Sequence, residues 1–175
     1  FQDSYELRYL MAVAARLEGD VEGAMVHLRA AVQLYDQGVD AWRDLATLAK
    51  NLEDEALYDR ASERVYMLNQ HDPGLARERA RRHVAAGEFE LAWGALERWL
   101  DVNPFDPEVH RFVIEVAPKV GHEPALARSW RALILLREAE RDELYPRAIE
   151  SLRAHGLDED VAKFKKWAEE DGVAL

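Results

Sequence analysis

The chain has 175 residues, 49% of them hydrophobic, so it is long enough to bury a sizeable core and too apolar for intrinsic disorder. It has no cysteine, which excludes disulfides and thiolate metal sites. The net charge of -11 disfavours nucleic acid and anionic lipid as partners unless basic residues gather on one face, and no apolar run is long enough to span a bilayer.

Apolar residues recur at spacings of three and four along the chain, as in residues 21–35 and 89–100, which is the period of an amphipathic helix. No window alternates with period two, so we predict no strand. The ten predicted helices, in chain order, are 4–17, 21–37, 39–51, 54–70, 73–86, 88–102, 107–119, 123–139, 142–155 and 158–170. They form five antiparallel pairs, each too small to bury its own apolar face, so stacking must complete the core.

The turns between paired helices carry glycines with a period of 34 residues: Gly19, Gly87, Gly121 and, one residue late, Gly156. Glycine suits such turns because it adopts the left-handed helix-cap conformation without steric cost. Glu53 occupies the one position of this 34-residue series, between Gly19 and Gly87, that lacks a glycine. Asp72-Pro73 and Asp106-Pro107 mark further boundaries, since each places an N-cap acid before a proline at the first helical position.

Five units share this register, at about residues 5–38, 39–72, 73–106, 107–141 and 142–171. The third unit carries, at the corresponding positions, Ala76, Arg79, Ala80, Gly87, Ala92, Leu96, Trp99 and Pro104. A 34-residue helix-turn-helix unit of this kind resembles the tetratricopeptide repeat. The resemblance implies an all-α, right-handed superhelix of about five repeats, forming one domain over residues 1–175. It also implies an interaction module and not an enzyme.

Two residues depart from the repeat pattern. Arg79 stands where the family has an apolar residue, so we expect it to be partly buried and paired. Pro118 lies late in the predicted helix 107–119, and a proline there should kink or end that helix.

In the tetratricopeptide family, the first helices of the pairs line a concave groove. Carried over position by position, the predicted groove residues are Tyr9, Arg43, Arg77 and Arg111 at the fifth position, Arg81 at the ninth and Lys50 at the twelfth. Arginine suits carboxylate recognition because its planar fork makes paired hydrogen bonds. We therefore predict a protein- or peptide-binding scaffold with a partly basic groove for an acidic or carboxylate-bearing segment.

Local pairing is the alternative role for these cations. Arg111 has Glu108 three residues before it and Glu115 four after it, so it could be satisfied within its own helix. Arg77 and Arg81 differ, because they lie four residues apart on one helix and repel each other.

No pattern of catalytic, cofactor-binding or metal-ligating residues stands out. The six histidines form no His-Glu-x-x-His motif, and the chain has no glycine-rich phosphate loop and no Gly-x-Ser-x-Gly turn. Trp42, Trp93, Trp99 and Trp130 fall at or near packing positions, so we predict them in the core. Trp167 is predicted to form the packing face of the last helix, or to dock another domain or a second copy if that face is uncovered.

A second interpretation is a non-catalytic accessory or oligomerisation domain of a larger, possibly enzymatic, protein, motivated by a first residue that is not methionine. Self-association is possible under either interpretation. We expect a protein or peptide partner and neither nucleic acid nor membrane insertion. The sequence leaves the cellular compartment open.

Overall fold

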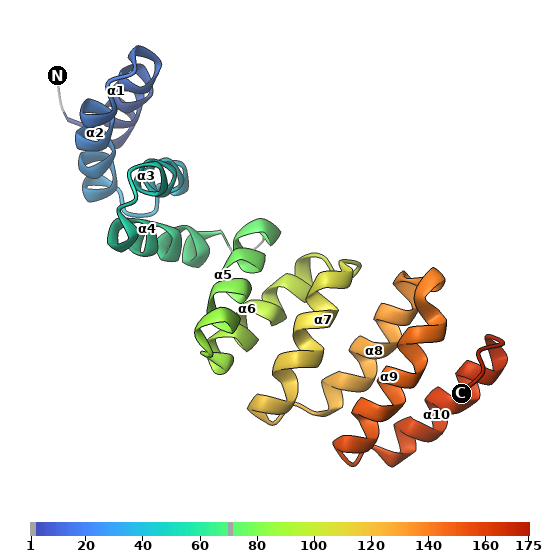
Figure 1. Ribbon diagram of the computed structural model, residues 1–175. Helices are drawn as coiled ribbons and strands as arrows, with labels where there is room; N and C mark the ends of the chain where they lie inside the picture. The colour runs from blue at the N-terminus through green and yellow to red at the C-terminus, as the bar shows by residue number, and fades with distance from the viewer. Residues whose placement is uncertain (1–2, 70–71) are drawn as a thin grey trace. The chain divides into compact units, whose positions relative to one another are not determined.

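The computed structural model describes residues 3–69 and 72–175, and these residues form α-helices, two short 3-10 turns and no strand (Figure 1). The helices are α1 (Tyr5–Glu18), α2 (Val21–Leu34), α3 (Val39–Asn51), α4 (Glu55–Leu68), α5 (Pro73–Ala86), α6 (Phe89–Val102), α7 (Pro107–Val116), α8 (Pro124–Leu136), α9 (Arg141–Ala154) and α10 (Asp158–Glu170). The 3-10 turns are η1 (Ala117–Val120) and η2 (Glu138–Glu140). The all-α prediction is therefore confirmed.

Each predicted helix corresponds to one of α1–α10, but three were predicted to end three residues too late: 21–37, 107–119 and 123–139. In the second of these, α7 ends at Val116 and Pro118 lies in the 3-10 turn η1, which confirms the expected effect of this proline. The predicted end of the fourth helix at residue 70 lies outside the described residues.

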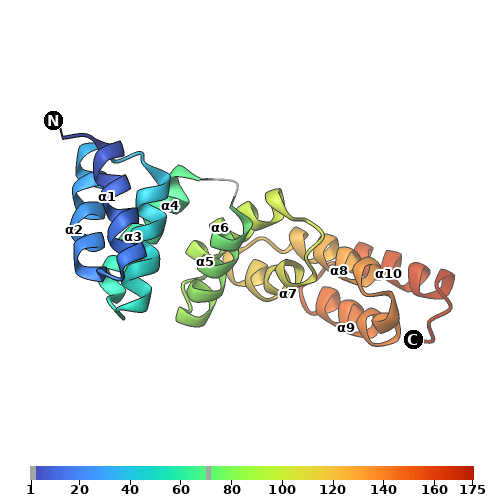
Figure 2. The same cartoon turned by 90° about the horizontal axis from the view of Figure 1, so that it is seen from above.

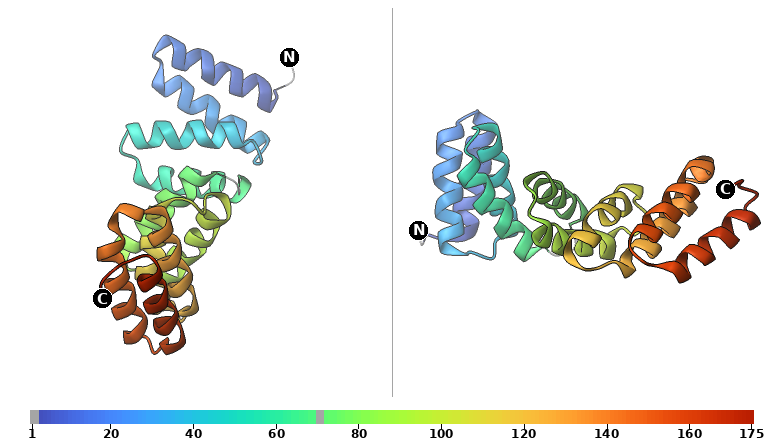
Figure 3. Two further views of the ribbon diagram at one scale, coloured as in Figure 1. Left: turned by 90° about the vertical axis from the view of Figure 1, so that its right-hand side faces the viewer. Right: turned by 60° about the horizontal axis from the view of Figure 1, so that its bottom comes forward.

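The contacts divide the chain into two compact units, which we describe separately: unit 1 is Phe1–Asp72 and unit 2 is Pro73–Leu175. Within unit 1, α2 packs against both α1 and α3, and α3 packs against α4 (Figure 2). Within unit 2, the pairs α5–α6, α7–α8 and α9–α10 follow one another, with α6 packed on α7 and α8 packed on α9 (Figure 3). Successive antiparallel pairs are the predicted repeat architecture.

The turns between paired helices share one backbone conformation. At Gly19, φ is 78°, and the amides of Gly19 and Asp20 donate to the carbonyls of Arg16 and Ala15 at the end of α1. Glu53 repeats this turn at a φ of 57°, the one positive φ of a non-glycine residue in the described part of the chain. A side chain in this region costs about 1–2 kcal/mol. The repeat thus imposes its turn geometry even where the glycine is missing.

One first helix in each unit, α3 in unit 1 and α7 in unit 2, buries the third, seventh and tenth residues of its repeat. In α3 and α7 these positions are apolar and buried: Ala41, Leu45 and Leu48, and Val109, Val113 and Val116. In α5 they are Leu75, Arg79 and Arg82, with Arg79 half-buried as expected. The boundary between the units therefore falls at a helix whose apolar stripe is interrupted by arginines.

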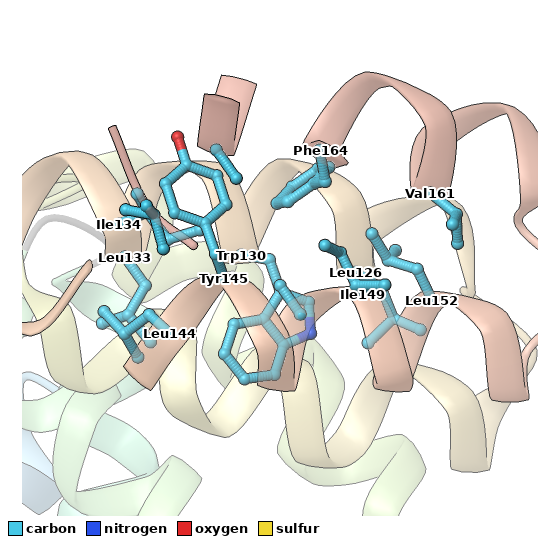
Figure 4. Packing of buried hydrophobic residues seen from close by; sticks show 13 residues of the cluster. Leu126, Trp130, Leu133, Ile134, Leu144, Tyr145, Ile149, Leu152, Val161 and Phe164 are labelled. Carbon is cyan, nitrogen blue, oxygen red and sulfur yellow. The ribbon is translucent and has the colours of Figure 1, made fainter. Parts of the chain in front are cut away.

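The largest side chains lie inside the units. Trp42, Trp99 and Trp130 are buried, which confirms their predicted place in the core, whereas Trp93 is half-buried and stacks on the His122 ring. Figure 4 shows the C-terminal core of unit 2, where Trp130, Tyr145 and Phe164 gather with aliphatic side chains of α8, α9 and α10. Trp167 is half-buried beside this core, with the Arg131 guanidinium 4.3 Å from the centre of its ring.

Candidate partner-binding site

Three of the predicted groove residues lie in unit 1, and they are held by its own side chains. The Tyr9 hydroxyl on α1 donates to Asp44 Oδ2 on α3 at 3.3 Å, and Arg16 Nη1 lies 2.5 Å from the same oxygen. Arg43 pairs with Asp40 on its own helix at 3.0 Å. Pairing within its own helix therefore describes Arg43, whereas Tyr9 bonds to the neighbouring first helix.

Lys50, the third predicted groove residue of unit 1, lies on α3 with its Nζ 5.7 Å from the centre of the Tyr58 ring on α4.

The hydroxyl of Tyr9 remains a donor over a wide pH range. Burial raises the pKa of Tyr9 above its usual value, and the nearby carboxylates of Asp44 and Asp40 act in the same direction. The link between α1 and α3 at Asp44 is thus a neutral hydroxyl and a cation sharing one carboxylate.

The other three predicted groove residues lie in unit 2, on α5 and α7. Arg81 reaches from α5 to Glu108 in the first turn of α7, where its Nε and Nη2 donate to the two carboxylate oxygens, each at 2.7 Å. This fork-to-fork pair joins neighbouring first helices. Arg81 is half-exposed, with a side-chain exposure of 51%. Water therefore has access to the pair.

Arg111 makes the next link along this face. Its Nη2 lies 3.8 Å from Glu140 Oε2 in η2, and Glu140 is also bound by Arg137. The hydrogen bond from Arg137 lowers the pKa of Glu140 below its usual value, and the charge of Arg111 adds to this effect. The sequence-based alternative, in which Arg111 is satisfied by Glu108 and Glu115, is not what the structure shows. Glu108 binds Arg81, and Glu115 pairs with Lys119 at 3.2 Å.

Arg77 is the exception among the six predicted residues. It is exposed on α5, and no ion pair or hydrogen bond joins its side chain to any residue that the structure describes. It lies one helical turn before Arg81. We call Arg77, Arg81 and Arg111 the α5–α7 arginine surface. An incoming carboxylate could pair with Arg77 directly, and with Arg81 by replacing Glu108.

Sequence reasoning missed a groove of about 570 Å³ on another part of unit 2. Its lining comes from α6, α7, α8 and the loop after α6, and includes Trp93, Leu100, Val113 and Ala125, with Glu97, Asp101 and Arg128 exposed among the lining residues. The groove combines residues of three helices, so no single periodic pattern in the sequence marks it. His110 of α7 also lines the groove.

His110 is anchored at this groove. It is 6% exposed, its Nε2 lies 2.8 Å from the Pro104 carbonyl oxygen, and its Nδ1 lies 3.4 Å from Ser129 Oγ. A neutral ring satisfies both contacts, with Nε2–H donating to the carbonyl and Nδ1 accepting from the hydroxyl. Burial lowers the pKa of His110 below its usual value.

This lowered pKa predicts a pH dependence of stability. Below the unfolded-state pKa of about 6.5, the unfolded chain binds a proton that the folded His110 resists. The contribution of His110 to folding is therefore complete above pH 6.5 or so and declines as the pH falls from there toward the folded pKa. Between pH 7 and pH 5, the free energy of unfolding measured in urea should fall less for His110→Gln than for the parent. Equal losses would contradict the assignment.

Neither a metal site nor a membrane span is evident in the part of the chain that the structure describes. No cluster of three or more histidine, aspartate or glutamate residues there is arranged to hold a metal ion. None of the described helices is both long and apolar enough to cross a membrane.

No protein-family model matches the chain, and no curated protein matches its sequence. Solved structures match most of its length. A crystal structure of YrrB, described as a TPR protein with an unusual peptide-binding site, is 14% identical, with a TM-score of 0.56 over 94% of this chain and 84% of that one. A crystal structure of MamA is 14% identical, with a TM-score of 0.53 over 95% and 91%. MamA from Desulfovibrio magneticus RS-1 is 12% identical, with a TM-score of 0.51 over 98% and 96%. The chain therefore has a fold of the tetratricopeptide-repeat kind, as predicted.

Proposed function

Because the chain has the tetratricopeptide-repeat fold, we propose that it is a protein-interaction scaffold that binds an acidic or carboxylate-bearing segment of a partner on the α5–α7 arginine surface. One observation carries the proposal, which is that Arg77 is an exposed cation to which no described residue offers an ion pair. The peptide-binding site named for YrrB, a protein of similar fold, supports a peptide as the kind of ligand.

The charges on this surface favour an added carboxylate. Side chains four residues apart on a helix are neighbours, so Arg77 and Arg81 repel each other, and Glu108 offsets the charge of Arg81 alone. A carboxylate placed between the two arginines would relieve that repulsion and could accept paired hydrogen bonds.

A ligand carboxylate could also replace Glu108 at Arg81 with little loss of folding free energy. An exposed ion pair is worth about 0–1 kcal/mol, so releasing Glu108 to water costs the fold little. Glu108 would then act as an internal stand-in for the ligand carboxylate, holding the Arg81 fork in the orientation that a partner requires. Such pre-orientation reduces the side-chain entropy lost on binding.

The proposal predicts loss of acidic-peptide binding in arginine variants. The probe is a fluorescein-labelled peptide of eight residues rich in glutamate with a free C-terminal carboxylate, titrated with the 175-residue chain. Arg77→Ala and Arg81→Ala should each weaken binding by roughly three- to tenfold, as expected for loss of one partly exposed charge pair. Added salt should weaken binding to the parent, because screening acts on exposed charges.

Two controls separate specific recognition from bulk charge. Arg29→Ala removes an exposed arginine from the second helix α2 and should leave affinity unchanged. A peptide with glutamine in place of glutamate and an amidated end should not bind. Unchanged affinity in both Arg77→Ala and Arg81→Ala, or an equal loss in Arg29→Ala, would refute the proposed site.

A further inference from the structure

A second surface lies on α1 and is apolar. Leu7, Leu10, Met11, Ala14 and Leu17 recur at spacings of three and four, which places them on one face of the helix, and all five are exposed. Leu10 is 64% and Leu17 84% exposed. We call these five residues the α1 stripe. Single exposed leucines are ordinary, but a continuous apolar stripe along one helix indicates a contact surface.

The repeat register shows what such a stripe does elsewhere in this chain. The residues 34 positions after Leu7, Met11 and Ala14 are Ala41, Leu45 and Leu48 of α3, and all three are buried in unit 1. There α3 packs against α2, the second helix of the preceding pair, as well as against its own partner α4. In unit 2, α7 packs in the same way on α6. The α1 stripe thus corresponds to the face through which α3 and α7 pack on the preceding second helix. No described helix covers this face of α1.

The last helix does not share this property. The exposed residues of α10 are almost all charged, among them Lys163, Lys165, Lys166, Glu169 and Glu170. A polar outer face is what a terminal helix of a repeat array needs for solubility. The two outermost described helices therefore differ, since α1 presents an apolar outer face and α10 a charged one. The charged face of α10 also makes it a poor match for the α1 stripe of another copy.

We propose that the α1 stripe binds an amphipathic helix of a partner protein, seated as α2 is seated on α3. The partner helix would present small and aliphatic residues at spacings of three and four, as second helices of this chain do. A second copy pairing through α1 is the weaker occupant. One helix offers much less than the roughly 800 Å² per partner of a stable dimer. Two chains of net charge -11 also repel each other.

The chain itself supplies the probe for this proposal. A labelled peptide with the sequence of α2, residues 21–34, acetylated and amidated, carries the face that α3 recognises. Fluorescence anisotropy should show saturable binding of this peptide to the full chain, and circular dichroism should show the peptide gaining helix. Met11→Glu should weaken binding by about tenfold or more, because it places a charge at the position whose α3 counterpart, Leu45, is buried in the apolar contact.

The matched control is Leu91→Glu. Leu91 is 59% exposed on α6, outside the stripe, so this variant adds the same charge without touching the proposed site. It should bind the peptide like the parent. Ala14→Glu, at an exposed position whose counterpart Leu48 is buried, provides a second stripe variant that should keep the fold intact.

Three outcomes would overturn the proposal. They are absence of saturable binding to the parent, equal binding by the parent and both stripe variants, and a dimer of the parent in sedimentation velocity that Met11→Glu dissociates. The last result would assign the stripe to a second copy. Because the acidic-peptide probe tests arginines on α5, its failure would not affect this result.

Discussion

Replacement of Trp99 by alanine is expected to destabilise unit 2 by about 3–5 kcal/mol, the usual cost of removing a large aromatic side chain from a core. Trp99 is 1% exposed, and its ring centre lies 6.1 Å from that of Phe112 on α7. It therefore joins two successive pairs as well as filling the space within its own. Losses of this size are comparable to the whole stability of many domains.

Urea unfolding followed by far-ultraviolet circular dichroism measures this loss. Trp99→Phe should cost clearly less, because the smaller ring still fills part of the cavity. Leu91→Ala is the control on the same helix, and its exposed side chain should change the unfolding free energy by no more than about 0.5 kcal/mol. A Trp99→Ala variant as stable as Leu91→Ala would show that α6 does not pack on α7 through this ring.

The fold was predictable because the same sequence pattern recurs in several repeats and fixes their common register. Glycine, proline and small residues recur at the same positions, so an error in one unit is corrected by its neighbours. Glu53 illustrates this, since its unit lacks the glycine and the turn still has a positive φ. The segments after the three helix ends placed too late each hold a residue that can extend the apolar pattern, namely Tyr35, Ala117 and Ala139. Hydrophobic periodicity alone therefore does not mark these ends.

The ion pairs were less predictable, because sequence reasoning compared each arginine with neighbours three and four residues away. In the structure Arg81 pairs with Glu108, 27 residues on, and Arg111 with Glu140, 29 residues on. These separations are a little shorter than one repeat, so each pair joins a first helix to the start of the next one, Glu108 in α7 and Glu140 just before α9. A search for opposite charges at that spacing would have found both pairs. Such a search would also have offered Asp106, 29 residues after Arg77, although no ion pair of Arg77 is seen among the described residues.

Phe164→Ala is expected to lower the free energy of unfolding by about 3–5 kcal/mol, as much as Trp99→Ala. Unlike the effect of Trp99→Ala, this destabilisation should be confined to one end of unit 2. Phe164 is 1% exposed and packs edge-on against Tyr145 of α9, with ring centres 6.4 Å apart. In a repeat array each pair is stabilised mainly by its neighbours, so damage at the last helix need not spread to the first pair of unit 2. The loss should therefore appear as local unfolding of α10.

Hydrogen exchange read by mass spectrometry separates local from global unfolding. In Phe164→Ala, amides of residues 158–170 should exchange at least about a hundredfold faster than in the parent, whereas those of α5 and α6 should change little. Lys165→Ala alters an exposed residue of the same helix and should leave exchange as it is. Equal acceleration throughout unit 2 would mean that the unit unfolds as one cooperative block. In that case α10 would contribute to the stability of the arginine-bearing helices, together with Asp171, which directly follows α10 and accepts a hydrogen bond from the Tyr145 hydroxyl at 2.5 Å.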